Sequence, residues 1–229
     1  MNLEVLYLDN HLLVVAKPPG LLAQGDDTGD PTVLTLGKAW LKERFNKPGR
    51  VYLGLVHRLD RPASGVMVLA RTSKAARRLT EQFRARDPEK CYLAIVEGHC
   101  TGAGFCEDYL LKEHRQVRVV RAGTPKAKRA ALRWRAVALR DGLSLLDVRL
   151  ETGRSHQVRV QMAHRGWPLL GDFRYGAQHE FDGRNLALHS YRLTVEHPTQ
   201  RLPITWAAPP PAPWYTRFGI EIEGMMPGT

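Results

Sequence analysis

Asp60 stands between two arginines in the segment LVHRLDRPASG, residues 55–65, where an apolar run gives way to a Pro/Gly turn. Arg58 and Arg61 favour the ionised form of this carboxylate, because opposite charges nearby stabilise a charge. An ionised carboxylate held in a cleft can act as a nucleophile or as a base. The alternative is an aspartate that caps the turn or pairs with its neighbours at the surface. This segment alone leaves both interpretations open.

Two further residues have types and positions suited to chemistry. Arg154 lies in the glycine turn of LETGRSHQVRVQMAHRGWPLLGD, where a guanidinium can meet a carboxylate through two parallel hydrogen bonds. Tyr92 lies on a predicted strand, a position where a tyrosine is more often a core aromatic than a functional one. His156 and His164 could lie near one another, but no third ligand stands at metal spacing, so we expect no metal site.

The charge of the chain indicates a polyanionic partner. Its 229 residues include 34 Lys+Arg against 23 Asp+Glu, a net charge of +11. Basic residues cluster in two segments, 115–121 and 126–135, which argues against a charge spread evenly for solubility. Each phosphate that a basic residue contacts releases counterions, so nucleic acid is the partner that this pattern favours.

The cysteines and the apolar segments indicate a compartment. Three cysteines without a CxxC pair make a disulfide framework or a structural zinc site improbable and fit a reducing environment. No segment approaches the roughly 20 apolar residues that a membrane span needs. The first residues, MNLEVLYLDN, lack the pattern of a signal peptide. We therefore expect a cytoplasmic protein with no membrane contact.

The elements that must position these residues form an α+β pattern, with a mixed, mostly antiparallel central sheet and flanking helices. The first two strands flank an Asp-Asn turn, and strands dominate from Lys90 onward. Three helices are predicted, with Asp30, Thr72 and Ser155 as their N-caps, and Gly166 stops the third. We expect one catalytic domain over residues 1–208, followed by a Pro-rich tail over 209–229.

The segment LGLVHRLDRPASGVMVLARTSKAARRL closely resembles the signature of the RluA-type family of RNA pseudouridine synthases, HRLDxxTSG followed by an apolar strand. The resemblance continues in family order through LYLDNHLLVVAKPPGLL, KCYLAIVEG, the Arg154 segment and LALHSYRLTVEHP, and so covers nearly the whole chain. Ala63 stands where the family usually has Thr, and Val66 where Leu is common. Neither position carries chemistry.

The resemblance implies the pseudouridine synthase catalytic fold and the isomerisation of specific uridines to pseudouridine in structured RNA, ribosomal or transfer. It implies no cofactor, no metal and no nucleotide cofactor, and we expect a monomer. By this analogy Asp60 is the catalytic aspartate, Tyr92 lies beneath the uracil, and Arg154 is the salt-bridge partner of Asp60. Arg58 corresponds to the arginine that fills the gap left by the flipped base.

Further residues are expected to bind RNA, on the analogy and on their charge: His57, Arg58, Arg61, Lys126, Lys128, Arg129, His156, Gln157 and Arg159. The chain opens directly on the first catalytic motif, so we expect a member without an N-terminal S4-type RNA-binding module. Two other functions stay open. One is a catalytically silent RNA-binding protein on the same scaffold, and the other is a hydrolase that cleaves the glycosidic bond and releases uracil.

Overall fold

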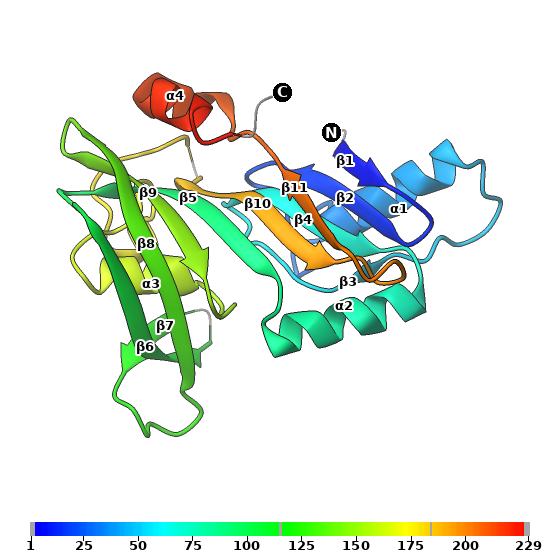
Figure 1. The fold of residues 1–229 in the computed structure, drawn as a ribbon, viewed down its shortest axis with the longest axis horizontal. Helices are drawn as coiled ribbons and strands as arrows, with labels where there is room; N and C mark the ends of the chain where they lie inside the picture. The colour runs from blue at the N-terminus through cyan, green and yellow to red at the C-terminus, as the bar shows by residue number, and fades with distance from the viewer. Residues whose placement is uncertain (1–2, 115, 184, 227–229) are drawn as a thin grey trace. The chain divides into compact units, whose positions relative to one another are not determined.

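The computed structural model describes residues 3–114, 116–183 and 185–226 and divides the chain into two compact units (Figure 1). The first unit comprises Met1–Glu89 and Ser190–Pro209, and the second comprises Lys90–His189 and Pro210–Thr229. Both units combine mostly antiparallel strands with few helices, which confirms the predicted α+β class.

The first unit contains the Asp60 segment and part of the sheet. Its strands follow the spatial order β1, β2, β4, β10, β11, and β3 pairs with the end of β4. The pairs β1–β2, β2–β4, β3–β4 and β10–β11 are antiparallel. The bounds of its elements are β1 Glu4–Leu8, β2 Leu12–Lys17, α1 Val33–Arg44, β3 Gly54–Leu55, β4 Ser64–Ala70, α2 Ser73–Ala85, β10 Leu188–Glu196 and β11 Pro203–Ala207.

Helices cover both faces of this sheet, which explains why β4 is buried along its whole length and carries apolar side chains from Val66 to Ala70. Alternate residues of β2 point to opposite faces. Leu12 packs with Leu79 of α2 in one core cluster. On the other face, a Cβ added to Gly37 of α1 would lie only 3.4 Å from Leu13 Cδ2, so α1 packs tightly there.

The starts of these two helices test the predicted N-caps. The side chain of Thr72 caps α2, as predicted. The prediction of Asp30 as the N-cap of α1 is wrong, because Thr32 occupies that position. The Thr32 hydroxyl accepts the Thr35 N–H at 3.0 Å, and the Thr35 hydroxyl accepts the Thr32 N–H at 2.9 Å. These two reciprocal bonds satisfy donors that a helix start leaves open.

The second unit is a curved antiparallel sheet with the order β5, β9, β8, β6, β7. Its long strand β8 alternates as predicted, with Leu132 buried and Arg133 exposed. The bounds of its elements are β5 Glu89–Glu97, β6 Ala103–Glu113, β7 Gln116–Val120, β8 Lys128–Arg140, β9 Leu143–Leu150, α3 Gln157–Ala163, η1 Phe173–Tyr175, η2 Ala212–Trp214 and α4 Tyr215–Glu223.

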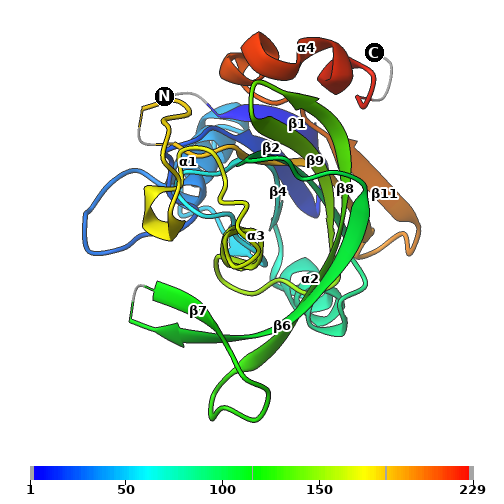
Figure 2. The same ribbon diagram turned by 90° about the vertical axis from the view of Figure 1, so that its left-hand side faces the viewer.

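Helix α3 lies inside the curve of β6 and β8 and contacts β6 and β7 (Figure 2). It begins after His156, whose backbone is left-handed (φ 52°), and no side chain caps it. The prediction of Ser155 as its cap is therefore wrong, whereas Gly166, with φ +81°, does follow its end. The segment predicted as a Pro-rich tail contains the short helices η2 and α4.

Candidate active site

Asp60 lies in the loop between β3 and β4 of the first unit, and its side chain is half-buried. Arg58 and Arg61 are exposed on either side, while Leu59 between them is buried. The carbonyl oxygen of Asp60 accepts the N–H of Ala63 at 3.1 Å, which closes a turn. The loop is thus anchored by an apolar side chain and presents one carboxylate together with two exposed cations.

Gly65 ends this loop at a position that only glycine can occupy. Its φ is +120°, and a Cβ there would lie 2.2 Å from the carbonyl oxygen of Ser190 in β10. The glycine of the motif therefore allows the start of β4 to approach β10 closely.

Arg61 ties the Asp60 loop to the segment that precedes α1. Its Nε donates to the carbonyl of Gly20 at 3.0 Å, and its Nη2 lies 2.7 Å from a carboxylate oxygen of Asp30. The N–H of Gly20 in turn donates to the carbonyl of Arg61 at 2.9 Å. Asp30 thus pairs with Arg61 instead of capping α1.

Lys17, at the end of β2, is a residue that sequence reasoning missed. Its side chain is only 1% exposed, and its Nζ donates to the carbonyls of Pro18 at 2.9 Å and Arg61 at 3.1 Å. Burial lowers the pKa of Lys17 to about 7; the negative charge of Asp60 opposes this effect, and Arg61 adds to it. The register pairs Lys17 with Gly65, so it lies at the same end of the sheet as the Asp60 loop.

His57 serves the fold of the same loop. Its Nε2 accepts the N–H of Val68 in β4 at 3.0 Å, and its ring stacks on Phe83 of α2 with centroids 4.8 Å apart. These contacts fix the loop to β4 and α2. Contact of His57 with RNA stays a prediction.

Tyr92 lies in the second unit, on β5, directly opposite Val148 of β9. Its side chain is 8% exposed. The predicted strand position is therefore confirmed, and its role beneath a uracil stays a prediction.

Arg154 lies in the loop between β9 and α3, and two contacts with its own unit hold it. Its backbone N–H donates to Gln157 Oε1 at 3.0 Å, and its Nε donates to the carbonyl of Arg129 in β8 at 3.0 Å. The predicted catalytic residues thus divide between the units, with Asp60 in the first and Tyr92 and Arg154 in the second.

His156 and Arg159 belong to a network around η1. The Tyr175 hydroxyl accepts the N–H of Val117 at 3.2 Å and lies 2.7 Å from His156 Nδ1. Burial raises the pKa of Tyr175. Like that of an ordinary tyrosine, its hydroxyl is protonated at neutral pH and can donate to His156. The guanidinium of Arg159 lies 5.1 Å from the centre of the Tyr175 ring.

Arg159 also forms a buried ion pair with Asp172. Nε and Nη2 donate to the two carboxylate oxygens at 2.7 and 2.8 Å, and the side chains are 6% and 1% exposed. Sequence reasoning missed Asp172 and Tyr175 because their partners lie 13 and 19 residues away. Because its side chain is buried and bonded to Asp172, Arg159 has little surface that could contact RNA.

The basic residues predicted to bind phosphates lie at the turn into β8. Lys126 and Lys128 are exposed, while Arg129 is half-buried and pairs with Glu107 at 2.6 Å. Arg115, at the start of the basic segment, lies outside the described residues.

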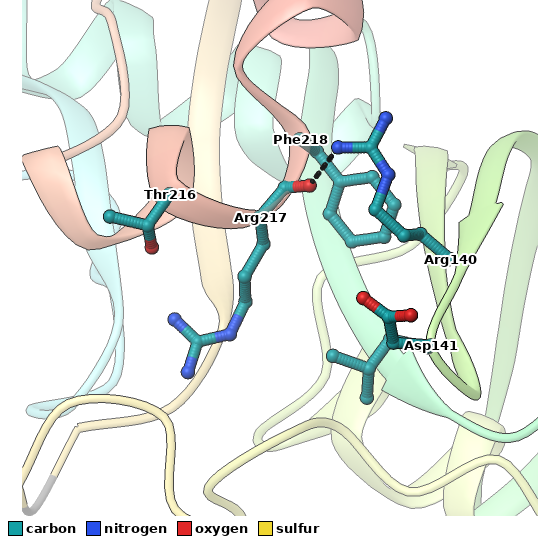
Figure 3. Close-up of a pocket in the computed structure, with 6 residues that line it drawn as sticks. Arg140, Asp141, Thr216, Arg217 and Phe218 are labelled. Carbon is teal, nitrogen blue, oxygen red and sulfur yellow. Dashed lines mark hydrogen bonds between the residues drawn. The ribbon is translucent and has the colours of Figure 1, made fainter.

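A cavity of about 70 Å³ lies between the β8–β9 turn and α4 in the second unit (Figure 3). None of the predicted site residues lines it. One of its walls is fixed by Arg140 Nη1, which donates to the carbonyl of Arg217 at 2.8 Å. Its lining residues are Arg140, Asp141, Leu143, Thr216, Arg217 and Phe218.

The sequence matches the family model described as RNA pseudouridylate synthase over residues 11–164. It is 38% identical over 222 residues to ribosomal large subunit pseudouridine synthase D of Xanthomonas campestris, covering 91% of this chain and 66% of the relative. It is 31% identical to tRNA pseudouridine synthase C of Pectobacterium carotovorum, covering 98% of this chain and 64% of the relative. The chain thus spans slightly less than two thirds of the length of these relatives.

A solved structure supports the same fold. Human RNA pseudouridylate synthase domain containing 4 superposes with a TM-score of 0.77 at 23% identity, covering 98% of this chain and 95% of the human one. The family model matches well over half of the chain, so the chain belongs to the RNA pseudouridylate synthase family.

No group of three or more His, Cys, Asp or Glu side chains in the part of the chain that the structure describes is arranged to hold a metal ion. Over residues 3–114, 116–183 and 185–226, no helix is both long and apolar enough to cross a membrane.

Proposed function

We propose that this chain isomerises specific uridines in RNA to pseudouridine, with Asp60 as the catalytic aspartate. The observation that carries the proposal is the placement of Asp60. It is a half-buried carboxylate on a closed turn between two exposed arginines. The buried Lys17 binds the backbone of the same loop, at the carbonyl of Arg61 next to the carboxylate.

The reaction breaks the N1–C1′ bond, turns the uracil over and joins C5 to C1′. A proton leaves C5 and N1 gains one, so the mass of the RNA is unchanged. Asp60 starts the reaction by attacking the sugar or the ring, or by assisting elimination from the sugar. Tyr92 lies beneath the uracil and serves as base or relay for the C5 proton. Arg154 is the salt-bridge partner of Asp60, and no cofactor or metal takes part.

RNA is the partner that the net charge of +11 favours. The target nucleotide leaves its stack to reach the pocket, and the exposed Arg58 occupies the gap. Lys126 and Lys128 contact phosphates. Gln157 and Arg159 instead support the RNA-facing loop from behind, because both side chains are buried and bonded within the protein.

The names of the relatives suggest the substrate class. One relative is named for the ribosomal large subunit and another for tRNA. We propose a ribosomal or transfer RNA as the substrate and a monomeric cytoplasmic enzyme. The catalytic residues all lie within 1–208, which we assign as the catalytic domain.

Product analysis tests this function against the two others. The protein is incubated with ribosomal and with transfer RNA, which are then digested and separated by liquid chromatography with mass detection. The proposal predicts pseudouridine in place of uridine, at equal mass and with no free uracil. Free uracil with an abasic site would assign a hydrolase. Binding of RNA without either product would assign a silent RNA-binding protein.

A further inference from the structure

We propose that Gln157 is a positioning residue that fixes Arg154 for its role beside the catalytic aspartate. The inference rests on the proposed function, which gives Arg154 that role. It concerns how the second unit holds Arg154, and all the contacts that carry it lie within that unit.

The amide of Gln157 is bonded on both sides. Its Oε1 accepts the backbone N–H of Arg154 at 3.0 Å and the hydroxyl of Thr152 at 2.7 Å. Its Nε2 donates to the carbonyl of Ala131 in β8 at 3.0 Å. The two donors that face Oε1 define the orientation of the amide, because an NH₂ group cannot accept from them. The side chain is 3% exposed, so water does not compete for these bonds.

The same strand holds this loop at further points. The Thr152 hydroxyl oxygen accepts the N–H of Ala131 at 2.9 Å, and Arg154 Nε donates to the carbonyl of Arg129 at 3.0 Å. Arg154 is thus fixed through its backbone N–H, which bonds to Gln157, and through Nε, which bonds to β8.

The N–H of Thr152 still donates to the carbonyl of Ala131 in β8 at 3.2 Å, whereas the N–H of Arg154 bonds to the side chain of Gln157. Residues 151–156 form bends and turns between β9 and α3, and His156 is left-handed. The N–H of Arg154 is partly buried, and Gln157 supplies its hydrogen-bond partner. Loss of the Gln157 amide would remove the hydrogen bond to the Arg154 backbone. The orientation of the Arg154 side chain would then be less well defined.

Gln161 provides a matched control one turn further along α3. It is also fully buried, and its Nε2 donates to Ala130 in β8 at 3.2 Å and to Asp108 at 2.7 Å. None of its hydrogen bonds reaches residues 152–156. A purely structural role predicts similar effects at the two glutamines, whereas a positioning role predicts a difference in the chemical step.

The test compares Gln157→Met with Gln161→Met in single-turnover reactions at saturating substrate RNA, after folding has been verified by circular dichroism. We expect the rate to fall about tenfold or more in Gln157→Met, because small misplacements of a catalytic group are costly. We expect it to stay within about twofold of wild type in Gln161→Met, with RNA affinity unchanged in both. Equal rates in the two variants, or a wild-type rate in Gln157→Met, would overturn the inference.

A second pair decides the question if Gln157→Met does not fold. Thr152→Val removes the hydroxyl that donates to Gln157, and Thr152→Ser keeps it. We expect a lower rate in Thr152→Val and a rate close to wild type in Thr152→Ser. Equal rates in this pair contradict the positioning role. Failure of the proposed function would look different, because the wild-type protein itself would then form no pseudouridine.

Discussion

The loop that carries Asp60 and the loop that carries Arg154 are held by different chemistry. In the first unit a buried ammonium group, that of Lys17, binds the backbone of the Asp60 loop. In the second unit a neutral amide and a hydroxyl, those of Gln157 and Thr152, bind the Arg154 loop. A buried charge responds to pH, and a buried amide does not. The difference predicts that the two loops can be perturbed independently.

The largest effect on stability is expected at the buried ion pair of the second unit. Arg159→Leu leaves the carboxylate of Asp172 buried without its partner, which should lower the free energy of unfolding by about 3–5 kcal/mol. Arg77→Leu is the matched control, since Arg77 pairs with Glu81 on the surface and its loss should be nearly neutral. Urea unfolding of both variants measures the contrast. Equal losses would mean that burial does not distinguish these pairs.

The next largest effect is the change in stability with pH that Lys17 causes. Because the folded protein has a pKa of about 7 at Lys17 against 10.5 for an ordinary lysine, the unfolded chain binds more protons between these values. Stability from this group therefore rises with pH, by about 2 kcal/mol between pH 7 and pH 9. Lys17→Met should remove this rise. The free energy of unfolding of wild type minus that of Lys17→Met, followed from pH 7 to pH 9, is the measurement.

Other titrating groups cancel in that difference. Burial raises the pKa of Cys100 to about 11, which makes stability fall at high pH in both proteins. The same measurement on Gln157→Met sharpens the comparison, because its loss of stability should not change with pH. A pH-dependent loss in Gln157→Met, or a constant one in Lys17→Met, would contradict the contrast between the two loops.

The smallest effect is expected at the turn into β8. Replacing the exposed Lys126 and Lys128 with serine should reduce the slope of log affinity against log salt by about 0.7 per lost phosphate contact, without changing the rate at saturating RNA. Serine at the exposed Lys42 and Lys47 of the α1 region removes the same charge and serves as control. Equal slopes in the two double variants would place the phosphate contacts elsewhere.

The sequence was informative where structure is local. Strands on either side of the Asp-Asn turn, the Thr72 cap and the alternation of β8 were all predicted, because each depends on residues close in the chain. The prediction of Asp30 as a cap was wrong because Thr32 forms a reciprocal pair of hydrogen bonds with Thr35 at the helix start. Asp30 instead pairs with Arg61, 31 positions further along the chain.

The supports of the site could not be predicted for the same physical reason. Lys17 is buried only because the loop that contains Arg61 returns to it over 44 residues, and lysine is usually exposed. Asp172 pairs with Arg159 of α3, and the Tyr175 hydroxyl accepts the N–H of Val117 in β7, so both depend on segments distant in the chain. Gln157 was predicted to bind RNA from its motif, whereas its burial and its contacts with β8 indicate a supporting role.

We expect Asp60 to perform the chemistry, and Asp60→Asn is the decisive variant. Asparagine keeps the shape of the side chain and removes the charge that a nucleophile or base needs. Asp30→Asn is the control, because Asp30 is a second carboxylate that pairs with Arg61 and the proposed reaction does not use it. Pseudouridine formation is measured on the same RNA for both variants, together with RNA affinity and melting temperature. We expect no product from Asp60→Asn, with affinity and folding retained, and near-normal product from Asp30→Asn. Measurable pseudouridine formed by purified Asp60→Asn would contradict it.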